Sequence, residues 1–175
     1  MRYSLIRKMD ISNGFGVGIS LFVQGCHFHC QGCFNQETWD FNGGYEWTQE
    51  IEDKFIELAN KPYIQRISFL GGEPLADENV ETVFHVIQRL KSIYPEKKIW
   101  IFTGYTWENI LHQTSQNALT RLMTVALSDV VADGQFQIDK QDINHKQILW
   151  VGSLNQRVID VQKSFESDSV VLYDN

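Results

Sequence analysis

Residues 19–34 read ISLFVQGCHFHCQGCF, an apolar run that passes directly into a loop containing every cysteine of the chain. The run over 19–23 is aliphatic and aromatic apart from one serine, which predicts a buried strand. Cys26, Cys30 and Cys33 follow this strand in the spacing CxxxCxxC. Because sites in α/β proteins lie beyond the carboxyl ends of the strands, we expect this loop to form part of a site.

Three thiolates at this spacing predict a metal centre in which one position lacks a protein ligand. Thiolates are soft ligands that suit iron–sulfur clusters and zinc. In the cluster interpretation, Cys26, Cys30 and Cys33 hold three irons of a 4Fe–4S cluster and the fourth iron stays open to a small chelating ligand. Gly25 and Gly32 would let the backbone approach the cluster closely.

Two other interpretations of the loop remain open. His29 together with the three cysteines makes a Cys3His set, the ligand set of a closed zinc site in a non-catalytic binding module. Structural zinc sites usually take their ligands from two separated segments, whereas this set falls within eight consecutive residues. In the third interpretation the cysteines are free thiols that act as small apolar side chains.

The rest of the chain alternates short apolar runs with amphipathic stretches. Further strands are predicted at 67–70, 98–102, 130–132 and 148–151, with a short one at 170–172. Thr48 is expected to cap a helix that buries Ile51, Phe55 and Leu58. Two more helices are expected, one capped by Asp77 with Val80, Val83, Phe84, Ile87 and Leu90 on one face, and one beginning at Thr106 with Ile110 and Leu111 inward.

Strands and helices joined by short turns predict a single α/β domain over 1–175 with a parallel sheet. The units are too few for an eight-fold barrel of about 250 residues, so we expect an open, partial barrel of about five or six βα units. Polar or glycine-rich turns end its strands at the cysteine loop, 71–74, 103–105 and 133–134. The carboxyl ends of parallel strands share one edge, so these turns should form one site.

Composition excludes several classes of function. The 175 residues are 43% hydrophobic, which is typical of a globular protein. The net charge is −7 and no basic run occurs, so we expect no nucleic-acid partner. No secretory segment and no apolar stretch of about 18 residues is visible, so we expect no membrane association. Clustered cysteines suit a reducing compartment, and the expected location is the cytoplasm.

Two motifs together carry a resemblance to a known family. CxxxCxxC followed by Phe34 resembles the signature of radical S-adenosylmethionine enzymes, and the GGEP turn at 71–74 is similar to their second hallmark. Other runs resemble the small activating enzymes of anaerobic ribonucleotide reductase. These runs lie at 10–14, 34–39, 103–105, 133–136 and 152–156, and the resemblance extends over about positions 3–160.

The resemblance implies a fold, two cofactors and two partners. It implies a radical S-adenosylmethionine fold with a 4Fe–4S cluster on the three cysteines and S-adenosylmethionine at the open iron. Reductive cleavage would give a 5′-deoxyadenosyl radical, which would generate a glycyl radical on the large subunit of anaerobic ribonucleoside-triphosphate reductase. A one-electron donor such as flavodoxin is the second implied partner.

The cofactor-binding residues expected from these motifs lie in the cysteine loop and in the turns after the strands. They are Gly32, Cys33, Phe34, Gly71, Gly72, Glu73, Thr103 and Asp133, with metal ligands Cys26, Cys30 and Cys33. No catalytic residue is expected beyond the cluster and S-adenosylmethionine. Asn155, Gln156 and Arg157 are expected near the mouth of the site or on its partner surface. Activation of another glycyl-radical enzyme, such as pyruvate formate-lyase, would use the same residues and is the alternative.

Overall fold

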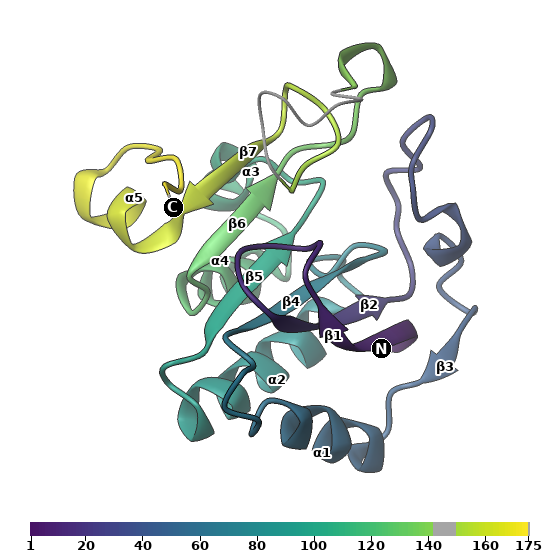
Figure 1. The fold of residues 1–175 in the computed structure, drawn as a ribbon. Coiled ribbons are helices and arrows are strands. Elements are labelled where there is room, and N and C mark those ends of the chain that lie inside the picture. Colours follow the sequence, from purple (N-terminus) through teal and green to yellow (C-terminus); the bar gives the residue numbers. More distant parts are fainter. Residues whose placement is uncertain (142–149, 175) are drawn as a thin grey trace.

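The computed structural model describes residues 1–141 and 150–174. Its strands are β1 (Arg2–Asp10), β2 (Gly18–Val23), β3 (Tyr45–Glu46), β4 (Arg66–Gly71), β5 (Lys98–Phe102), β6 (Val130–Asp133) and β7 (Arg157–Asp160). Its helices are α1 (Gln49–Leu58), α2 (Val80–Ile93), α3 (Trp107–His112), α4 (Ala118–Ala126) and α5 (Val161–Ser167), with 3-10 turns η1 (Gln36–Thr38) and η2 (Ile138–Lys140). The strands form one seven-stranded sheet in the order β3-β1-β2-β4-β5-β6-β7 (Figure 1).

The middle of this sheet is parallel, as the sequence predicts. Strands β2, β4, β5 and β6 run in the same direction, so their carboxyl ends lie at one edge. The outer strands β1, β3 and β7 pair antiparallel, which corrects the expectation of a wholly parallel sheet. Strand β1 was not predicted from the sequence. It lies near the edge of the sheet, and its charged residues Arg2, Arg7 and Lys8 interrupt the apolar pattern that indicates a strand.

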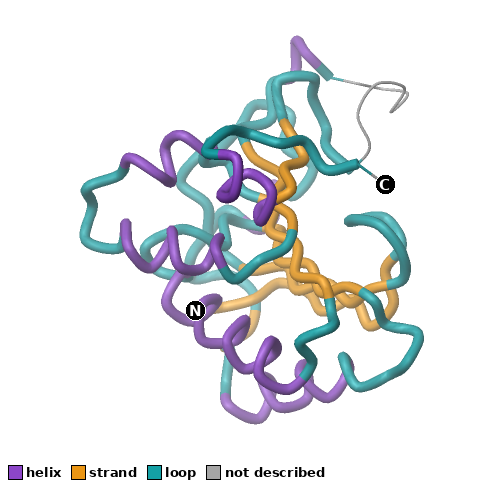
Figure 2. The backbone as a smooth tube through the Cα atoms, turned by 90° about the vertical axis from the view of Figure 1, so that its left-hand side faces the viewer, coloured by secondary structure: helices purple, strands orange, loops and turns teal. Residues whose placement is uncertain are grey.

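The two faces of the sheet differ in chemistry because successive side chains of a strand point to opposite sides. Ile19, Ile67 and Ile99 lie in register on β2, β4 and β5, and all three are fully buried in the core under the helices. Figure 2 shows the helices gathered on this side of the curved sheet. The next residues, Ser20 and Ser68, also lie in register, on the opposite face. One face therefore builds the main core, and the other carries these polar groups beside a smaller apolar cluster around Trp100.

Predicted elements are confirmed where a local pattern determines them. Strands at 67–70, 98–102 and 130–132 appear as β4, β5 and β6. The hydroxyl of Thr48 accepts a hydrogen bond from the amide of Ile51 (3.3 Å) and caps α1. The hydroxyl of Thr106 likewise accepts from Asn109 (3.2 Å) and caps α3. Both caps satisfy amides that a helix leaves unpaired at its first turn.

Other predicted details are wrong, because contacts distant in sequence decide them. Helix α2 begins after Asn79 without a side-chain cap, and the carboxylate of Asp77 binds Arg121 of α4 instead. Ile110 is buried as expected, whereas Leu111 is 36% exposed because α3 turns it toward solvent. The short strand expected at 170–172 is a single bridge between Leu172 and Ile159.

The strand predicted over 148–151 lies only in part within the described residues. Positions 148 and 149 lie outside the described residues, and Trp150 and Val151 belong to no strand. The place beside β6 is taken by β7, which follows at Arg157–Asp160 and pairs antiparallel. Val151 instead joins a second, smaller apolar cluster around Trp100, so its hydrophobicity reflects side-chain packing without strand pairing.

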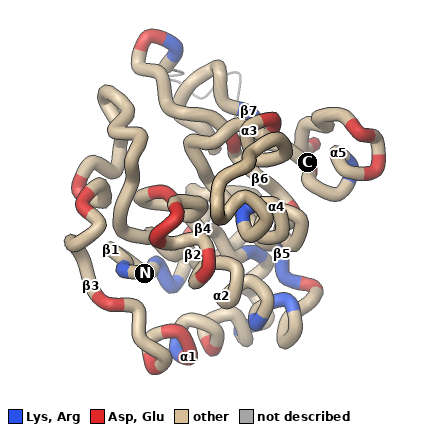
Figure 3. Tube along the Cα trace, turned by 180° about the vertical axis from the view of Figure 1, so that it is seen from behind, with Lys and Arg blue, Asp and Glu red and all other residues tan. Residues whose placement is uncertain are grey.

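Charge is distributed unevenly over this fold. The sequence has no Lys or Arg between Lys8 and Lys54, a segment that includes the cysteine loop. Figure 3 shows acidic residues along β3 and α1, with a basic stretch among those of α1 and others near β1 and α2. The cysteine loop therefore lies in a segment without basic side chains of its own. Within the described residues, no helix has the length and apolar character needed to cross a bilayer.

Candidate iron–sulfur site

A cavity of about 660 Å³ lies at the carboxyl ends of the parallel strands. The cysteine loop after β2, the GGE turn after β4 and the turn after β5 all line it. The lining includes Cys26, Cys30, Cys33, Phe34, Gly71, Gly72, Glu73, Thr103 and Gly104. The structure thus brings together at one cavity most of the residues that the sequence nominates. Of the expected cofactor-binding residues, Gly32 and Asp133 lie outside this lining, as do Asn155 and Arg157, which were expected near the mouth of the site.

The cysteine loop is closed at its base by backbone hydrogen bonds. The amide of Gly25 donates to the carbonyl of Thr38 (2.7 Å), and the amide of Cys26 donates to that of Trp39 (3.1 Å). The buried side chain of Gln24 donates to the carbonyls of Glu37 (3.1 Å) and Asp40 (2.9 Å). These bonds hold the two ends of the loop together beneath the thiols. The loop is therefore a fixed frame for whatever the cysteines bind.

The three thiols are half-buried, and none forms a disulfide. Burial raises the pKa of Cys26 to about 11, and the negative charge of Glu73 adds to this effect. Burial also raises the pKa of Cys30, and a charge on Cys33 would raise it further. At neutral pH the uncharged thiol is favoured at both positions. A bound metal centre would reverse this preference, because metal coordination deprotonates a thiol.

Amide donors already surround the sulfur atoms. The amide of Asn35 donates to Sγ of Cys33 (3.4 Å). Backbone groups of Phe28 and His29 act to lower the pKa of Cys26, and that of Phe136 acts to lower the pKa of Cys30, against the larger effect of burial. Hydrogen bonds to sulfur are one of the means by which proteins stabilise iron–sulfur clusters. The donor set therefore fits an iron–sulfur cluster held by these cysteines.

The histidines of the loop make other contacts. The ring of His29 stacks on Trp39 with 4.6 Å between centroids, and Nε2 of His27 lies 3.0 Å from the carboxylate of Glu78. In residues 1–141 and 150–174, no three His, Cys, Asp or Glu side chains gather closely enough to hold one metal ion. A zinc site needs its ligands around a single ion, whereas a cluster places each thiolate on a different iron. The observed arrangement favours the cluster.

The GGE turn is bonded directly to the cysteine loop. The amide of Gly72 donates to the carbonyl of Val23 (2.9 Å), and the amide of Glu73 donates to that of Gly25 (2.7 Å). A Cβ atom on Gly72 would lie 2.4 Å from the carbonyl oxygen of Gly25, and Gly71 has a φ of +101°. The sequence thus needs both glycines, one for the close approach and one for the left-handed backbone.

Glu73 joins this turn to the end of β5. Its buried carboxylate accepts hydrogen bonds from Oγ1 of Thr103 (2.8 Å) and from the amides of Gly104 (2.7 Å) and Leu75 (2.9 Å). Burial raises its pKa to about 7, although these donors and the charge of Arg121 act in the opposite direction. Glu73 and Thr103 therefore serve first to fix the edges of the cavity.

Replacing Glu73 with glutamine is expected to remove a pH dependence of stability between about pH 4.5 and about pH 7. The folded pKa lies above the unfolded value, so in this window the folded state holds a proton that the unfolded state has released. The wild-type free energy of unfolding should fall as pH rises through the window, by about 3 kcal/mol in all. Urea unfolding across the window measures it, with the exposed Glu81→Gln as control. Parallel curves for wild type and Glu73→Gln would contradict the assignment.

Phe34 forms one side of the cavity, and Gly32 lies two residues before it in the cysteine loop. The ring of Phe34 is 64% exposed and lies 5.1 Å from that of Phe136. Gly32 has a φ of +76°, and a Cβ atom there would lie 2.7 Å from Ile138. Gly32 thus shapes the loop without lining the cavity, while Phe34 presents an apolar surface to it.

Asp133 is held away from the cavity. Its buried carboxylate accepts hydrogen bonds from the amide of Trp107 (2.7 Å) and from Nε of Arg157 (3.0 Å). Arg157 also binds the carboxylate of Glu108 and lowers its pKa to about 2. These three side chains connect β6, β7 and α3. The side chain of Asp133 thus lies outside the cavity lining, and its contact with a cofactor stays a prediction.

The cavity also has walls that sequence reasoning missed. Phe28 packs against Tyr105 with 5.0 Å between ring centroids, and Phe136, from the run 133–136, also lines the cavity. Gln156, which was expected near the mouth of the site, lines it as well. A third wall comes from Arg7, Ile11, Ser12 and Asn13, at the junction of β1 and β2. Ile11, Ser12 and Asn13 belong to the run 10–14, which carries part of the resemblance found in the sequence.

Comparison with known proteins places the chain in a class. The sequence matches a family model described as a 4Fe-4S single cluster domain over residues 12–159. This range contains the three cysteines and the GGE turn. With the geometry of the cysteine loop, the match defines an iron–sulfur protein.

Individual relatives narrow this class. The anaerobic ribonucleoside-triphosphate reductase-activating protein of Salmonella typhi is 39% identical over 160 residues, which cover 90% of this chain and 97% of that protein. The protein of the same name from Escherichia coli (strain K12) is 38% identical with the same coverage, and that of Enterobacteria phage T4 is 34% identical over 90% of this chain and 93% of its own length. The chain belongs to the family of anaerobic ribonucleoside-triphosphate reductase-activating proteins, which confirms the resemblance found in the sequence.

Proposed function

We propose that this chain is an activating enzyme that cleaves S-adenosylmethionine reductively at a 4Fe–4S cluster and generates a glycyl radical on anaerobic ribonucleoside-triphosphate reductase. The observation that carries the proposal is the hydrogen bond from Glu73 to Gly25, which joins the GGE turn to the cysteine loop at one cavity. The names of the relatives support the choice of partner.

The residues of the cavity have separable tasks in this proposal. Cys26, Cys30 and Cys33 would hold the cluster. When bound, the cluster would supply the electron that breaks the bond between sulfur and C5′ of S-adenosylmethionine, which would release methionine and the 5′-deoxyadenosyl radical that takes a hydrogen atom from a glycine of the partner. Gly72 offers backbone groups at the cavity, and the exposed ring of Phe34 offers an apolar surface for an adenine ring.

The open sheet suits a macromolecular substrate. Strands β3 and β7 lie at opposite ends of the strand order, and no pairing between them occurs in the described residues. We take this sheet as the partial barrel of radical S-adenosylmethionine enzymes. An unclosed sheet leaves the cavity open to the side, where a loop of another protein can enter. A radical formed inside would then meet a backbone glycine rather than bulk water.

A glycyl radical assay tests this function. The reconstituted, reduced protein is mixed without oxygen with S-adenosylmethionine and anaerobic ribonucleotide reductase, and the sample is studied by electron paramagnetic resonance. We expect a glycyl signal together with 5′-deoxyadenosine and methionine. A second arm uses pyruvate formate-lyase, and a signal there alone would establish the alternative. A third varies the electron donor and includes flavodoxin. Absence of 5′-deoxyadenosine in all arms would contradict the proposal.

A further inference from the structure

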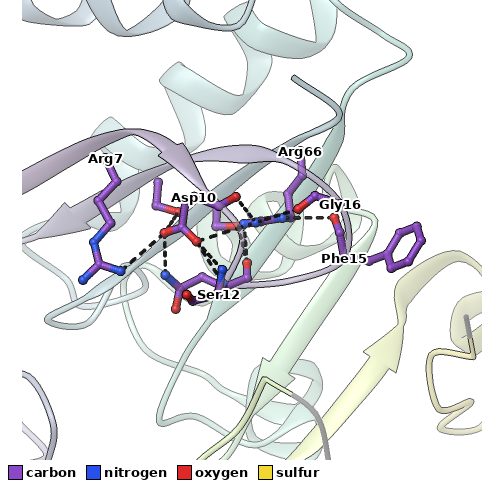
Figure 4. Close-up of polar contacts among 9 residues, drawn as sticks. Arg7, Asp10, Ser12, Phe15, Gly16 and Arg66 are labelled. Carbon is purple, nitrogen blue, oxygen red and sulfur yellow. Dashed lines mark hydrogen bonds and ion pairs between the residues drawn. The ribbon is translucent and has the colours of Figure 1, made fainter. Parts of the chain in front are cut away.

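A single buried arginine organises the segment between β1 and β2. Figure 1 shows this segment crossing in front of the sheet, and Gly14 lies close to the ring of Trp100 on β5. Arg66, the first residue of β4, reaches into the segment and is 1% exposed. Its guanidinium donates to the carbonyls of Asp10 (2.8 Å), Phe15 (3.2 Å) and Asn13 (Figure 4).

Further contacts make this arrangement specific for arginine. The guanidinium also donates to the carbonyl of Gly16 (3.3 Å) and to Oγ of Ser68 (2.6 Å). A planar fork with five N–H donors satisfies these acceptors, whereas an ammonium has three. A Cβ atom on Gly14 would lie 2.6 Å from Cδ of Arg66, and one on Gly18 would lie 2.9 Å from Cζ. Glycines at both positions therefore leave room for the side chain.

Asp10 completes the cluster from within the segment. Its carboxylate lies 3.7 Å from Arg66 and accepts hydrogen bonds from the amides of Ser12 (2.7 Å) and Asn13 (3.0 Å) and from Oγ of Ser20 (2.8 Å). Burial alone would raise the pKa of Asp10, but the hydrogen bonds from Asn13, Ser20 and Ser12 hold it below its usual value. The segment is thus folded around a paired buried charge.

This cluster fixes one wall of the cavity. Ile11, Ser12 and Asn13 line the cavity, and Ile11 is 74% exposed. The guanidinium of Arg7 lies beside them, 4.7 Å above the ring of Phe22, and its side chain is 45% exposed. This wall combines an exposed apolar side chain, a hydroxyl and a cation. Such a surface suits a polypeptide, which presents both apolar and polar groups. No cofactor contact is needed to explain them.

We propose that Arg66 is a positioning residue for partner binding, because it holds residues 11–13 as the wall that receives the polypeptide segment carrying the target glycine. The inference rests on the proposed function, in which that segment must enter this cavity. Arg66 itself is buried and touches neither cofactor nor partner. Its effect passes through the backbone carbonyls of the segment.

The test separates partner binding from chemistry. In the reconstituted protein, Arg66→Ala should raise the KM for the reductase by about tenfold or more, a loss of about 1.4 kcal/mol of binding. Cleavage of S-adenosylmethionine without the partner should fall far less. Arg66→Lys should be intermediate, and guanidinium chloride at low millimolar concentration should partly restore Arg66→Ala where sodium chloride does not. Arg89→Ala, which removes an arginine bound to Glu52 and Asp53, is the matched control.

Limited proteolysis tests directly whether the segment between β1 and β2 is held in place. Arg66→Ala should be cut by chymotrypsin after Phe15 faster than wild type, with iron content retained. An unchanged KM for the reductase would overturn the proposal, and so would a parallel loss of iron, cleavage and partner affinity. If Arg66→Ala does not fold, the same measurements on Arg66→Lys decide between these outcomes. If wild type forms no glycyl radical, the proposed function fails while the proteolysis still reports whether Arg66 holds the segment.

Discussion

Replacing Cys30 with alanine is expected to remove the bound iron and to lower the cleavage of S-adenosylmethionine to below about one hundredth of the wild-type rate, a loss of at least about 2.7 kcal/mol. The three thiols line the cavity, and the chain has no fourth cysteine to replace a lost ligand. The measurements are iron and sulfide content and 5′-deoxyadenosine formed under reducing conditions. Unchanged cleavage in the variant would contradict the cluster assignment.

His29→Ala is the matched control in the same loop. His29 lies next to Cys30, and its ring stacks on Trp39. In the cluster interpretation this variant keeps its iron and most of its activity. In the Cys3His interpretation it loses a zinc ligand and with it the metal. The two variants together therefore distinguish an iron–sulfur centre from a zinc site without reference to the partner.

Sequence reasoning succeeded where a short local pattern determines the structure. The strand over 19–23 and those seen as β4, β5 and β6 are apolar runs that end at glycine or polar turns. Their carboxyl ends share one edge because parallel pairing requires it. The meeting of the cysteine loop and the GGE turn follows from that rule, although no local signal links Gly25 to Glu73.

Local sequence patterns do not predict contacts between polar side chains that are far apart in the sequence. Arg66 binds a segment about fifty positions earlier in the chain, and Asp77 binds Arg121 rather than capping α2. Asp133 followed a strand as expected, yet its carboxylate pairs with Arg157 of β7. The sheet order decides each of these pairings. A short edge strand such as β7 has only a weak apolar pattern in the sequence. Contacts made by its residues are therefore not predicted either.

Replacing Gly72 with alanine is expected to uncouple the GGE turn from the cysteine loop. The added Cβ atom would lie 2.4 Å from the carbonyl oxygen of Gly25 and 3.0 Å from its amide nitrogen, and neither atom belongs to a side chain that can move aside. The turn must shift, which breaks the bonds from Gly72 to Val23 and from Glu73 to Gly25. We expect a loss of about 2 kcal/mol of stability and, because a displacement of about 1 Å misplaces reacting groups, a fall of about a hundredfold in cleavage.

The control for Gly72→Ala is Gly134→Ala, which separates a steric effect from backbone strain. Gly134 lines the same cavity and has a φ of +96°, but the nearest atom to an added Cβ is 3.7 Å away. Its replacement should cost about 1 kcal/mol for the left-handed backbone and leave the cysteine loop in place. Equal losses of iron and cleavage in the two variants would show that general destabilisation is the cause. A large loss confined to Gly72→Ala would mean that the close approach of two backbone segments aligns the site, as the bond from Glu73 to Gly25 requires.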